Sequence, residues 1–511
     1  MNADGNASSV ETERKWAVNG VQRGSSDSFA DYAEMATPPL APPARTPHAS
    51  PTSPVAPASP AETVPRTADP GRHAPRHSRG GRAGRWAGQA FRAVTVTAII
   101  AAIVWAGIKL PPARYLIYAV WLLPLIELAM LGLGQLHYRW RFRVAPPGKY
   151  TALIIQITTS GREQTRVSQI VNQIRGYNLA IPYQVWVVTE PGYANEYPMA
   201  DLVITVPASF SARSERKARA LEYSRRVRQS MGLSRADVKI LYNDDDVALT
   251  KAYIERSFQA DYDICQGIVA PRTEYGGPPL GHFLASHADD IRTHACLVYC
   301  SVFQGIIGRP LHVHGEGLAV TGETEHIITW DWPAFASEDL VFGQRAAEAG
   351  LKWGWFHEYA EGTPPWSLKD FIIQRARWLW GDIHGITHRD VLSRTAAMIT
   401  ALKYIVGATS LLLSLAGLYL RASGGINGQS PFFDVAKLSV VAWVTVFFAC
   451  GWVGAGSRVF SRSNDSRLLS ATVAVLVLPF SLALTCAGVF IPLIQGNPRT
   501  FKVISKTRER R

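Results

Sequence analysis

Three adjacent carboxylates, Asp244, Asp245 and Asp246, directly follow an apolar run in the stretch LYNDDDVAL. Side chains two residues apart on an extended chain point the same way, so Asp244 and Asp246 can face one cleft together. Paired carboxylate oxygens suit Mg²⁺ or Mn²⁺, with a diphosphate supplying further oxygen ligands. The alternative is an acidic turn that caps the next helix, ALTKAYIERSF, because aspartate is a good helix N-cap.

Two further charged groups have residue types that could act on a substrate near these carboxylates. Glu338 and Asp339, in SEDL, open a helical stretch. A carboxylate there can either stabilise the helix N-terminus or serve as a general base. Lys217, in KARALEY, is by default a surface lysine, but close to a diphosphate its ammonium would hold the donor.

The stretch QRARWLWG places Gln374, Arg377 and Trp378 at positions i, i+3 and i+4. On a helix these three side chains share one face. An arginine fork suits phosphate oxygens, and a tryptophan ring suits the face of a sugar or an apolar wall. The surrounding FIIQRARWLW also has the composition of a helix that lies on a membrane surface. The two roles are compatible, with one face on lipid and the other closing the site.

Residues 148–385, which must position these groups, alternate between short apolar runs and helical patterns. The runs include YTALIIQIT, IPYQVWVVT and VKILYN, and the helical patterns include SERKARALEYSRRVRQSMG. This alternation predicts an α/β domain with a largely parallel sheet and helices on both faces. Ligands of such sheets bind outside the carboxyl ends of the strands, and Asp244 ends one of them.

Long apolar runs on both sides of this domain predict an integral, multi-pass membrane protein. Two runs within 93–134 form a predicted transmembrane hairpin, and three more lie within 398–494. The arginine-rich flanks of the hairpin predict that the α/β domain lies in the cytoplasm, and we expect the membrane to be a bacterial plasma membrane. The basic tail, 495–511, should also stay inside, which three further crossings do not allow. The sequence therefore leaves five or six spans open.

The composition of the N-terminal region and the net charge limit the classes of function that the chain can have. Residues 1–85 are rich in Pro, Ala, Ser and Arg and are predicted to be disordered. The chain of 511 residues has a net charge of +13. No nucleic-acid recognition motif accompanies this charge, so we assign the basic excess to membrane orientation and expect no nucleic-acid partner.

Cysteines and histidines provide one further group of residues that can bind metals. Five cysteines form no CxxC pair. Cys296 and Cys300 would share a helix face, but no nearby pair completes a zinc site, so all five are interpreted as free thiols in a reducing compartment. His312 and His314 alternate in HVHGEG, which suggests either a metal or a strand edge near an acceptor.

Taken together, the DxD, ED and QxxRW motifs resemble, in order and spacing, a family 2 glycosyltransferase with a GT-A fold. The segments KARALEY, NDDD, QGIV, HADDIR, SEDLVFGQRA and QRARWLWG resemble, in order, the egghead-type β-1,4-mannosyltransferases over about residues 150–385. One departure is NDDDV, where egghead sequences usually have DEET. The resemblance implies an α/β GT-A (nucleotide-diphospho-sugar transferase) domain. The apolar runs and arginine flanks predict that this domain is cytoplasmic and inserted between α-helical transmembrane segments, and the composition of FIIQRARWLW predicts an interfacial helix at about 366–384.

The resemblance also implies roles for individual residues. Asp339 would deprotonate the acceptor hydroxyl, with Glu338 beside it as the second catalytic carboxylate. The donor-binding residues would be Thr159, Glu190, Lys217, Asp244, Asp246, Gln374, Arg377 and Trp378. Within this set, Thr159 and Glu190 would contact the nucleoside. Asp244 and Asp246 would hold the Mg²⁺ or Mn²⁺ ion.

The expected reaction is metal-dependent, inverting transfer of a sugar to a lipid-linked or glycolipid acceptor with a β-linkage. Mannose from GDP-mannose is favoured as the donor, and UDP-sugars remain open. One alternative is a processive polysaccharide synthase, similar to hyaluronan and cellulose synthases, which extrudes polymer through its own spans. The other is a catalytically silent membrane scaffold that binds a nucleotide sugar or a glycan.

Overall fold

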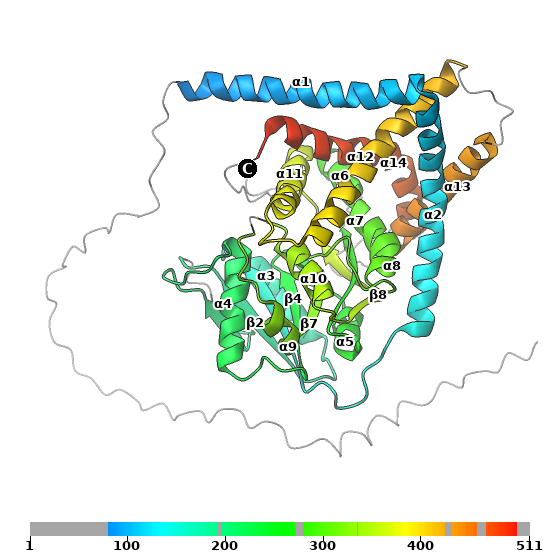
Figure 1. Ribbon diagram of the computed structural model, residues 1–511. Helices are drawn as coiled ribbons and strands as arrows, with labels where there is room; N and C mark the ends of the chain where they lie inside the picture. Colours follow the sequence, from blue (N-terminus) through cyan, green and yellow to red (C-terminus); the bar gives the residue numbers. More distant parts are fainter. Residues whose placement is uncertain are drawn as a thin grey trace, which may run out of the picture. The chain divides into compact units, whose positions relative to one another are not determined.

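The computed structural model describes residues 80–192, 196–271, 280–334, 336–424, 432–456 and 467–497. Most of the predicted disordered tail, 1–85, and the basic tail from residue 498 onwards lie outside the described residues. Between the first two and the last three long helices, strands and shorter helices alternate, as the sequence pattern predicts (Figure 1).

One sheet of eight strands has the order β3-β2-β1-β4-β7-β6-β8-β5. The strands are β1 (Ala152–Thr159), β2 (Tyr183–Thr189), β3 (Leu202–Thr205), β4 (Val238–Asp244), β5 (Val247–Leu249), β6 (Ile264–Pro271), β7 (Leu318–Thr321) and β8 (Trp353–Gly362). The prediction of a largely parallel sheet holds for β1 to β4, and β6 is parallel to β8. It is wrong for β7, which is antiparallel to β4 and β6, and for β5, which is antiparallel to β8.

The reversal at β7 has a simple cause. The chain leaves β6 at the carboxyl edge of the sheet, forms several short helices, and enters β7 through residues 311–317 at that same edge. A strand that enters where its neighbour left must run antiparallel to it. The register pairs Leu318 with both Tyr242 of β4 and Gln266 of β6, so this loop lies beside the end of β4.

Helices cover both faces of the sheet. They are α3 (Gln164–Gly176), α4 (Arg216–Ser230), α5 (Lys251–Gln259), α6 (Leu280–Asp289), α7 (Ile291–His294), the π-helical turn η2 (Ala295–Cys300), α8 (Ser301–Phe303), α9 (Gly322–Ile328) and α10 (Glu338–Glu348). Alternate β1 residues face opposite sides of the sheet. Leu153 and Ile155 pack with residues of α3 and α5, whereas Ile154 packs with residues of α4 and α10.

Within the described ranges, five helices are long and apolar enough to cross a membrane. They are α1 (Gly80–Lys109), α2 (Pro111–Arg141), α12 (Arg394–Ala422), α13 (Phe432–Gly456) and α14 (Arg467–Gln495). α1 packs against α12, α2 against α13, and α13 against α14. Five such helices indicate a membrane protein.

α11 (Leu368–Thr387) carries the QxxRW motif and packs against α12 and α14 (Figure 1). Its first turn is capped by Ser367, whose hydroxyl accepts a hydrogen bond from the backbone N–H of Asp370. Phe371 and Leu379 are buried. The motif therefore lies on a helix between the membrane-type helices and the edge of the sheet.

Candidate active site

A cavity of about 850 Å³ opens at the carboxyl edge of the sheet. All ten residues predicted to bind donor or act in catalysis line it, although they come from segments spread over more than 200 residues of sequence: Thr159, Glu190, Lys217, Asp244, Asp246, Glu338, Asp339, Gln374, Arg377 and Trp378. The register explains part of this convergence. Thr159 pairs with Thr189, the residue before Glu190, and Thr158 pairs with Asp244.

The three aspartates form the end of β4 and the turn that follows it. Asp245 accepts a hydrogen bond from the Thr159 hydroxyl at 2.8 Å. Asp246 is only 9% exposed, and its carbonyl oxygen accepts a hydrogen bond from Arg166 at 3.2 Å. These carboxylates do not cap the following helix, because α5 begins at Lys251 and its N-cap is Thr250, whose hydroxyl accepts from the N–H of Tyr253. The capping interpretation of this motif is therefore wrong.

Lys217 lies at the start of α4 and points at the aspartates. Its ammonium forms an ion pair with Asp244 and lies 3.8 Å from Glu338 Oε1. Burial opposes the charge on this lysine, but the carboxylates of Asp244 and Glu338 outweigh burial and raise its pKa above the usual range. Lys217 is therefore a protonated group inside the cavity wall.

Glu338 and Asp339 are the first two residues of α10, and Ser337 directly precedes them. Ser337 adopts a left-handed conformation, with φ 58° and ψ 36°, which is strained for a residue other than glycine. Asp339 Oδ1 accepts from the N–H of Leu340 at 2.9 Å. Burial raises the pKa of the Asp339 carboxyl to about 6, and repulsion from Glu338 acts in the same direction, whereas Lys217 lowers it.

This pKa gives a testable pH dependence. If Asp339 must be ionised to accept a proton, kcat/KM rises as the pH rises through about 6 and levels off above it. Glu338→Gln removes a repelling charge, so the Asp339 carboxyl ionises more easily and the midpoint moves to lower pH. The profiles of wild type and variant check this. A flat profile, or a midpoint moved upward by Glu338→Gln, would contradict the assignment.

The QxxRW residues form another wall of the cavity. Gln374 is 3% exposed, and among the described residues its Oε1 has no hydrogen-bond partner. A buried acceptor without a partner is costly, and a hydroxyl-rich ligand in the cavity would satisfy it. The Trp378 ring lies 4.3 Å from the guanidinium of Arg375 and 5.7 Å from that of Arg292.

Two arginines of this wall were not among the predicted site residues. Arg292 forms an ion pair with Glu316, and Arg375 donates to Asp289 Oδ1 at 2.6 Å. Both also line the cavity. The sequence contained a signal for part of this network, because Asp289 and Arg292 belong to HADDIR, a motif recognised above without an assigned role.

The loop at 311–317 forms the remaining side. His312 and His314 lie in this loop, rather than on a strand edge, and both line the cavity. Gly315 lies against Lys217 and Asp339. A Cβ atom at this position would be 2.5 Å from Lys217 Nζ and 3.5 Å from Asp339 Oδ2. The backbone of this loop therefore passes close to both charged groups, with no room for a side chain beside Lys217.

Gly315→Ala is expected to displace the ammonium of Lys217 while leaving the fold intact, because the clash involves the flexible end of a lysine, whereas Asp339 Oδ2 would be in ordinary van der Waals contact. A shift of about 1 Å in catalytic groups can lower turnover by about 100-fold. Turnover and thermal stability of the purified variant check this. Gly281→Ala is the matched control, since a Cβ there meets nothing within 4 Å. Equal turnover in the two variants would show that Gly315 does not position the site.

On the side away from the sheet, the cavity reaches two of the membrane-type helices. Lys403 and Tyr404 of α12 line it, as do Thr485 and Val489 of α14. Asp382 of α11 holds the first pair, because its Oδ2 accepts from the Tyr404 hydroxyl at 2.7 Å and from Lys403 Nζ at 3.1 Å. One continuous space thus connects the aspartates to the helices that are apolar enough for a membrane.

Residues 239–484 match the family model described as glycosyl transferase family group 2. This range begins in β4 and ends in α14, and it contains the DxD, ED and QxxRW motifs. None of the curated proteins matches the chain in sequence. Among solved structures, the chain is similar to the mannosyltransferase PcManGT from Pyrobaculum calidifontis in complex with GDP-Man and Mn²⁺, with 14% identity, a TM-score of 0.36, and coverage of 70% of this chain and 99% of that chain.

Proposed function

We propose that this chain, a glycosyltransferase with a family 2 catalytic domain and a GT-A fold, transfers a sugar from a nucleotide donor to a lipid-linked or glycolipid acceptor. The observation that carries this proposal is the cavity at the carboxyl edge of the sheet, which joins all of the predicted site residues. It contains paired carboxylates and a lysine at the sheet edge, a second carboxylate pair opposite, and a wall of membrane-type helices.

The donor set at the end of β4 fits a hard divalent cation. Asp244 and Asp246 both line the cavity and offer only oxygen ligands, which Mg²⁺ and Mn²⁺ prefer. Such an ion, when bound, would neutralise the diphosphate of the donor. Lys217 already forms an ion pair with Asp244, so its ammonium is placed to contact a diphosphate held beside that carboxylate.

The chemical step assigned to the protein is proton transfer to Asp339. The oxygen of an acceptor hydroxyl forms a bond to the anomeric carbon, and the bond from that carbon to the diphosphate oxygen breaks. The proton passes to Asp339, and the nucleoside diphosphate leaves with the bonding electron pair. A single displacement of this kind inverts the anomeric centre, so an α-linked donor gives a β-linked product. Arg377 would stabilise negative charge on the leaving group.

The donor is proposed to be GDP-mannose. The support is the resemblance of KARALEY, HADDIR, SEDLVFGQRA and QRARWLWG to the egghead-type β-1,4-mannosyltransferases. Thr159 and Glu190 would contact the nucleoside at the ends of β1 and β2. Glu190 is held by an ion pair with Arg219 of α4, which fixes its carboxylate at the cavity wall.

The acceptor is proposed to be lipid-linked and to meet the site from the membrane side. The reactive sugar of such an acceptor lies at the membrane interface. The cavity reaches α12 and α14, so that sugar could approach Asp339 without the lipid leaving the bilayer. Arg139 and Arg141 in the last turn of α2, and Arg143 just after it, favour a cytoplasmic catalytic domain under the positive-inside rule.

The experiment is a screen of nucleotide sugars with the purified full chain and a short-chain lipid phosphate sugar as acceptor. We expect nucleotide release from GDP-mannose that requires Mn²⁺ or Mg²⁺, and a product with one added β-linked sugar by NMR. Release from a UDP-sugar alone would replace the proposed donor. A long polymer would favour the processive synthase, and no release from any donor would favour the silent scaffold.

A further inference from the structure

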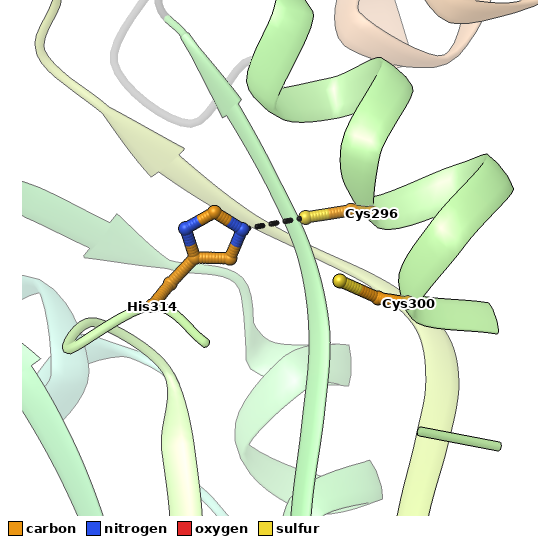
Figure 2. Close-up of side chains that lie close together, drawn as sticks. All are labelled: Cys296, Cys300 and His314. Carbon is orange, nitrogen blue, oxygen red and sulfur yellow. Dashed lines mark hydrogen bonds between the residues drawn. The ribbon is translucent and has the colours of Figure 1, made fainter. Parts of the chain in front are cut away.

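Two cysteines and a histidine from separate elements meet beside the cavity. Cys296 and Cys300 lie one turn apart on η2, and His314 lies in the loop at 311–317. Their sulfur and nitrogen atoms all lie within 4.8 Å of one another. The Cys296 Sγ and His314 Nε2 atoms are 3.2 Å apart, and Figure 2 shows both thiols directed at the imidazole ring.

The surroundings hold these three groups in place. Cys296 is fully buried and Cys300 is 2% exposed. The N–H of Val269 donates to Cys296 Sγ at 3.4 Å. The backbone of His314 is fixed by Gln266, which accepts from its N–H at 3.1 Å and donates to its carbonyl oxygen at 2.7 Å. Little rearrangement is needed for the three side chains to act together.

We propose that Cys296, Cys300 and His314 bind a zinc ion. Two thiolates and an imidazole nitrogen are a ligand set that zinc favours, with bonds of about 2.3 Å to sulfur and about 2.0 Å to nitrogen. Around a tetrahedral ion these bonds place sulfur and nitrogen about 3.5 Å apart. The observed 3.2 Å between Cys296 and His314 is close to that value. On binding, both thiols lose their protons to solvent, and water from the cavity supplies the fourth ligand.

This site is separate from the cation proposed at Asp244 and Asp246. The aspartates offer hard oxygen ligands, whereas a pair of thiolates selects soft ions. The sequence showed no second pair near the cysteines, because the third ligand is brought in by the reversal of the chain between β6 and β7. The zinc proposal does not depend on the proposed donor or acceptor.

The proposed zinc ion would hold the loop at 311–317, which forms part of the cavity wall, against η2. His314 is followed by Gly315, the residue that lies against Lys217 and Asp339. An ion that joins His314 to η2 would restrict the movement of this loop and would therefore help to keep Lys217 and Asp339 in their positions. In this role the three ligands are positioning residues, and their loss should lower kcat more than it raises the KM for donor.

The test is the metal content of the full chain, purified in detergent with a reductant and through a tag without histidines. We expect one zinc ion per chain by elemental mass spectrometry. Replacement by Co²⁺ should give the sulfur-to-cobalt absorption and the visible bands of a tetrahedral thiolate complex. Cys300→Ser and His314→Gln should lose the zinc. Cys486→Ser, a cysteine on α14 outside the cluster, should keep it.

Asp246→Asn should also keep the zinc, which separates failure of this proposal from failure of the aspartate site. Wild-type protein without stoichiometric zinc, and without the cobalt bands in excess Co²⁺, would overturn the proposal and leave a thiol–imidazole hydrogen bond. Zinc that is retained in both ligand variants would overturn it as well. The cobalt spectrum of the wild type decides the matter even if a variant does not fold.

Discussion

Replacing Asp339 with asparagine is expected to lower sugar transfer by about 10²–10⁴-fold while donor binding is retained. Asparagine has nearly the same shape but cannot accept the proton of the acceptor hydroxyl. The variant also keeps the hydrogen bond from the N–H of Leu340, because an amide oxygen can accept it. The expected loss is therefore in the chemical step and not in folding.

Single-turnover transfer and calorimetric titration with GDP check this expectation in wild type and variant. Asp390→Asn is the matched control, since the Asp390 carboxylate is exposed and its ion pair with Arg213, at 3.2 Å, lies at the surface. The control should transfer sugar at the wild-type rate. Unchanged turnover in Asp339→Asn would remove Asp339 as the base.

Replacing Asp246 with asparagine is expected to lower transfer by about 100-fold or more. A divalent cation contributes several kcal/mol to a transition state in which the diphosphate departs, and each 1.36 kcal/mol is a factor of ten in rate. Removal of one of the two carboxylate ligands should weaken the binding of both the ion and the donor. Asp246 is nearly buried, so the isosteric amide keeps the packing of the turn.

A chelator should reproduce the Asp246→Asn defect in the wild type, and added Mn²⁺ or Mg²⁺ should reverse it. Asp245→Asn tests position within the motif, because Asp245 is engaged by the Thr159 hydroxyl and is expected to matter less than Asp246. Normal turnover of Asp246→Asn in metal-free buffer would exclude the metal site at these carboxylates.

The sequence predicted those parts of the fold that depend on local pattern. The apolar runs around β1, β2 and β4 are long and continuous, and the placement of Asp244 at the end of β4 follows from them. β5 and β7 are short, with three and four residues, and their antiparallel pairing depends on partners distant in the chain. The periodicity of apolar residues along the sequence contains no information on such pairing.

The same distinction applies to the site. The motif residues of α11 could be placed together because helical spacing puts Gln374, Arg377 and Trp378 on one face. The contact of His314 with Cys296 could not be predicted, because it arises from the return of the chain at the sheet edge. The misassigned helix cap has a similar origin, since Thr250, rather than an aspartate, is the residue that precedes the first turn of α5.

The central claim is that a cation at Asp244 and Asp246 presents the donor to Asp339. The most direct measurement is an experimental structure of the full chain with GDP-mannose and Mn²⁺, with the ion located by its anomalous scattering. We expect Mn²⁺ between the two aspartates and the diphosphate. The anomeric carbon should face the Asp339 carboxylate, with a gap between them large enough for the acceptor hydroxyl. A bound donor without an ion at these aspartates, and with its anomeric carbon turned away from Asp339, would contradict the account.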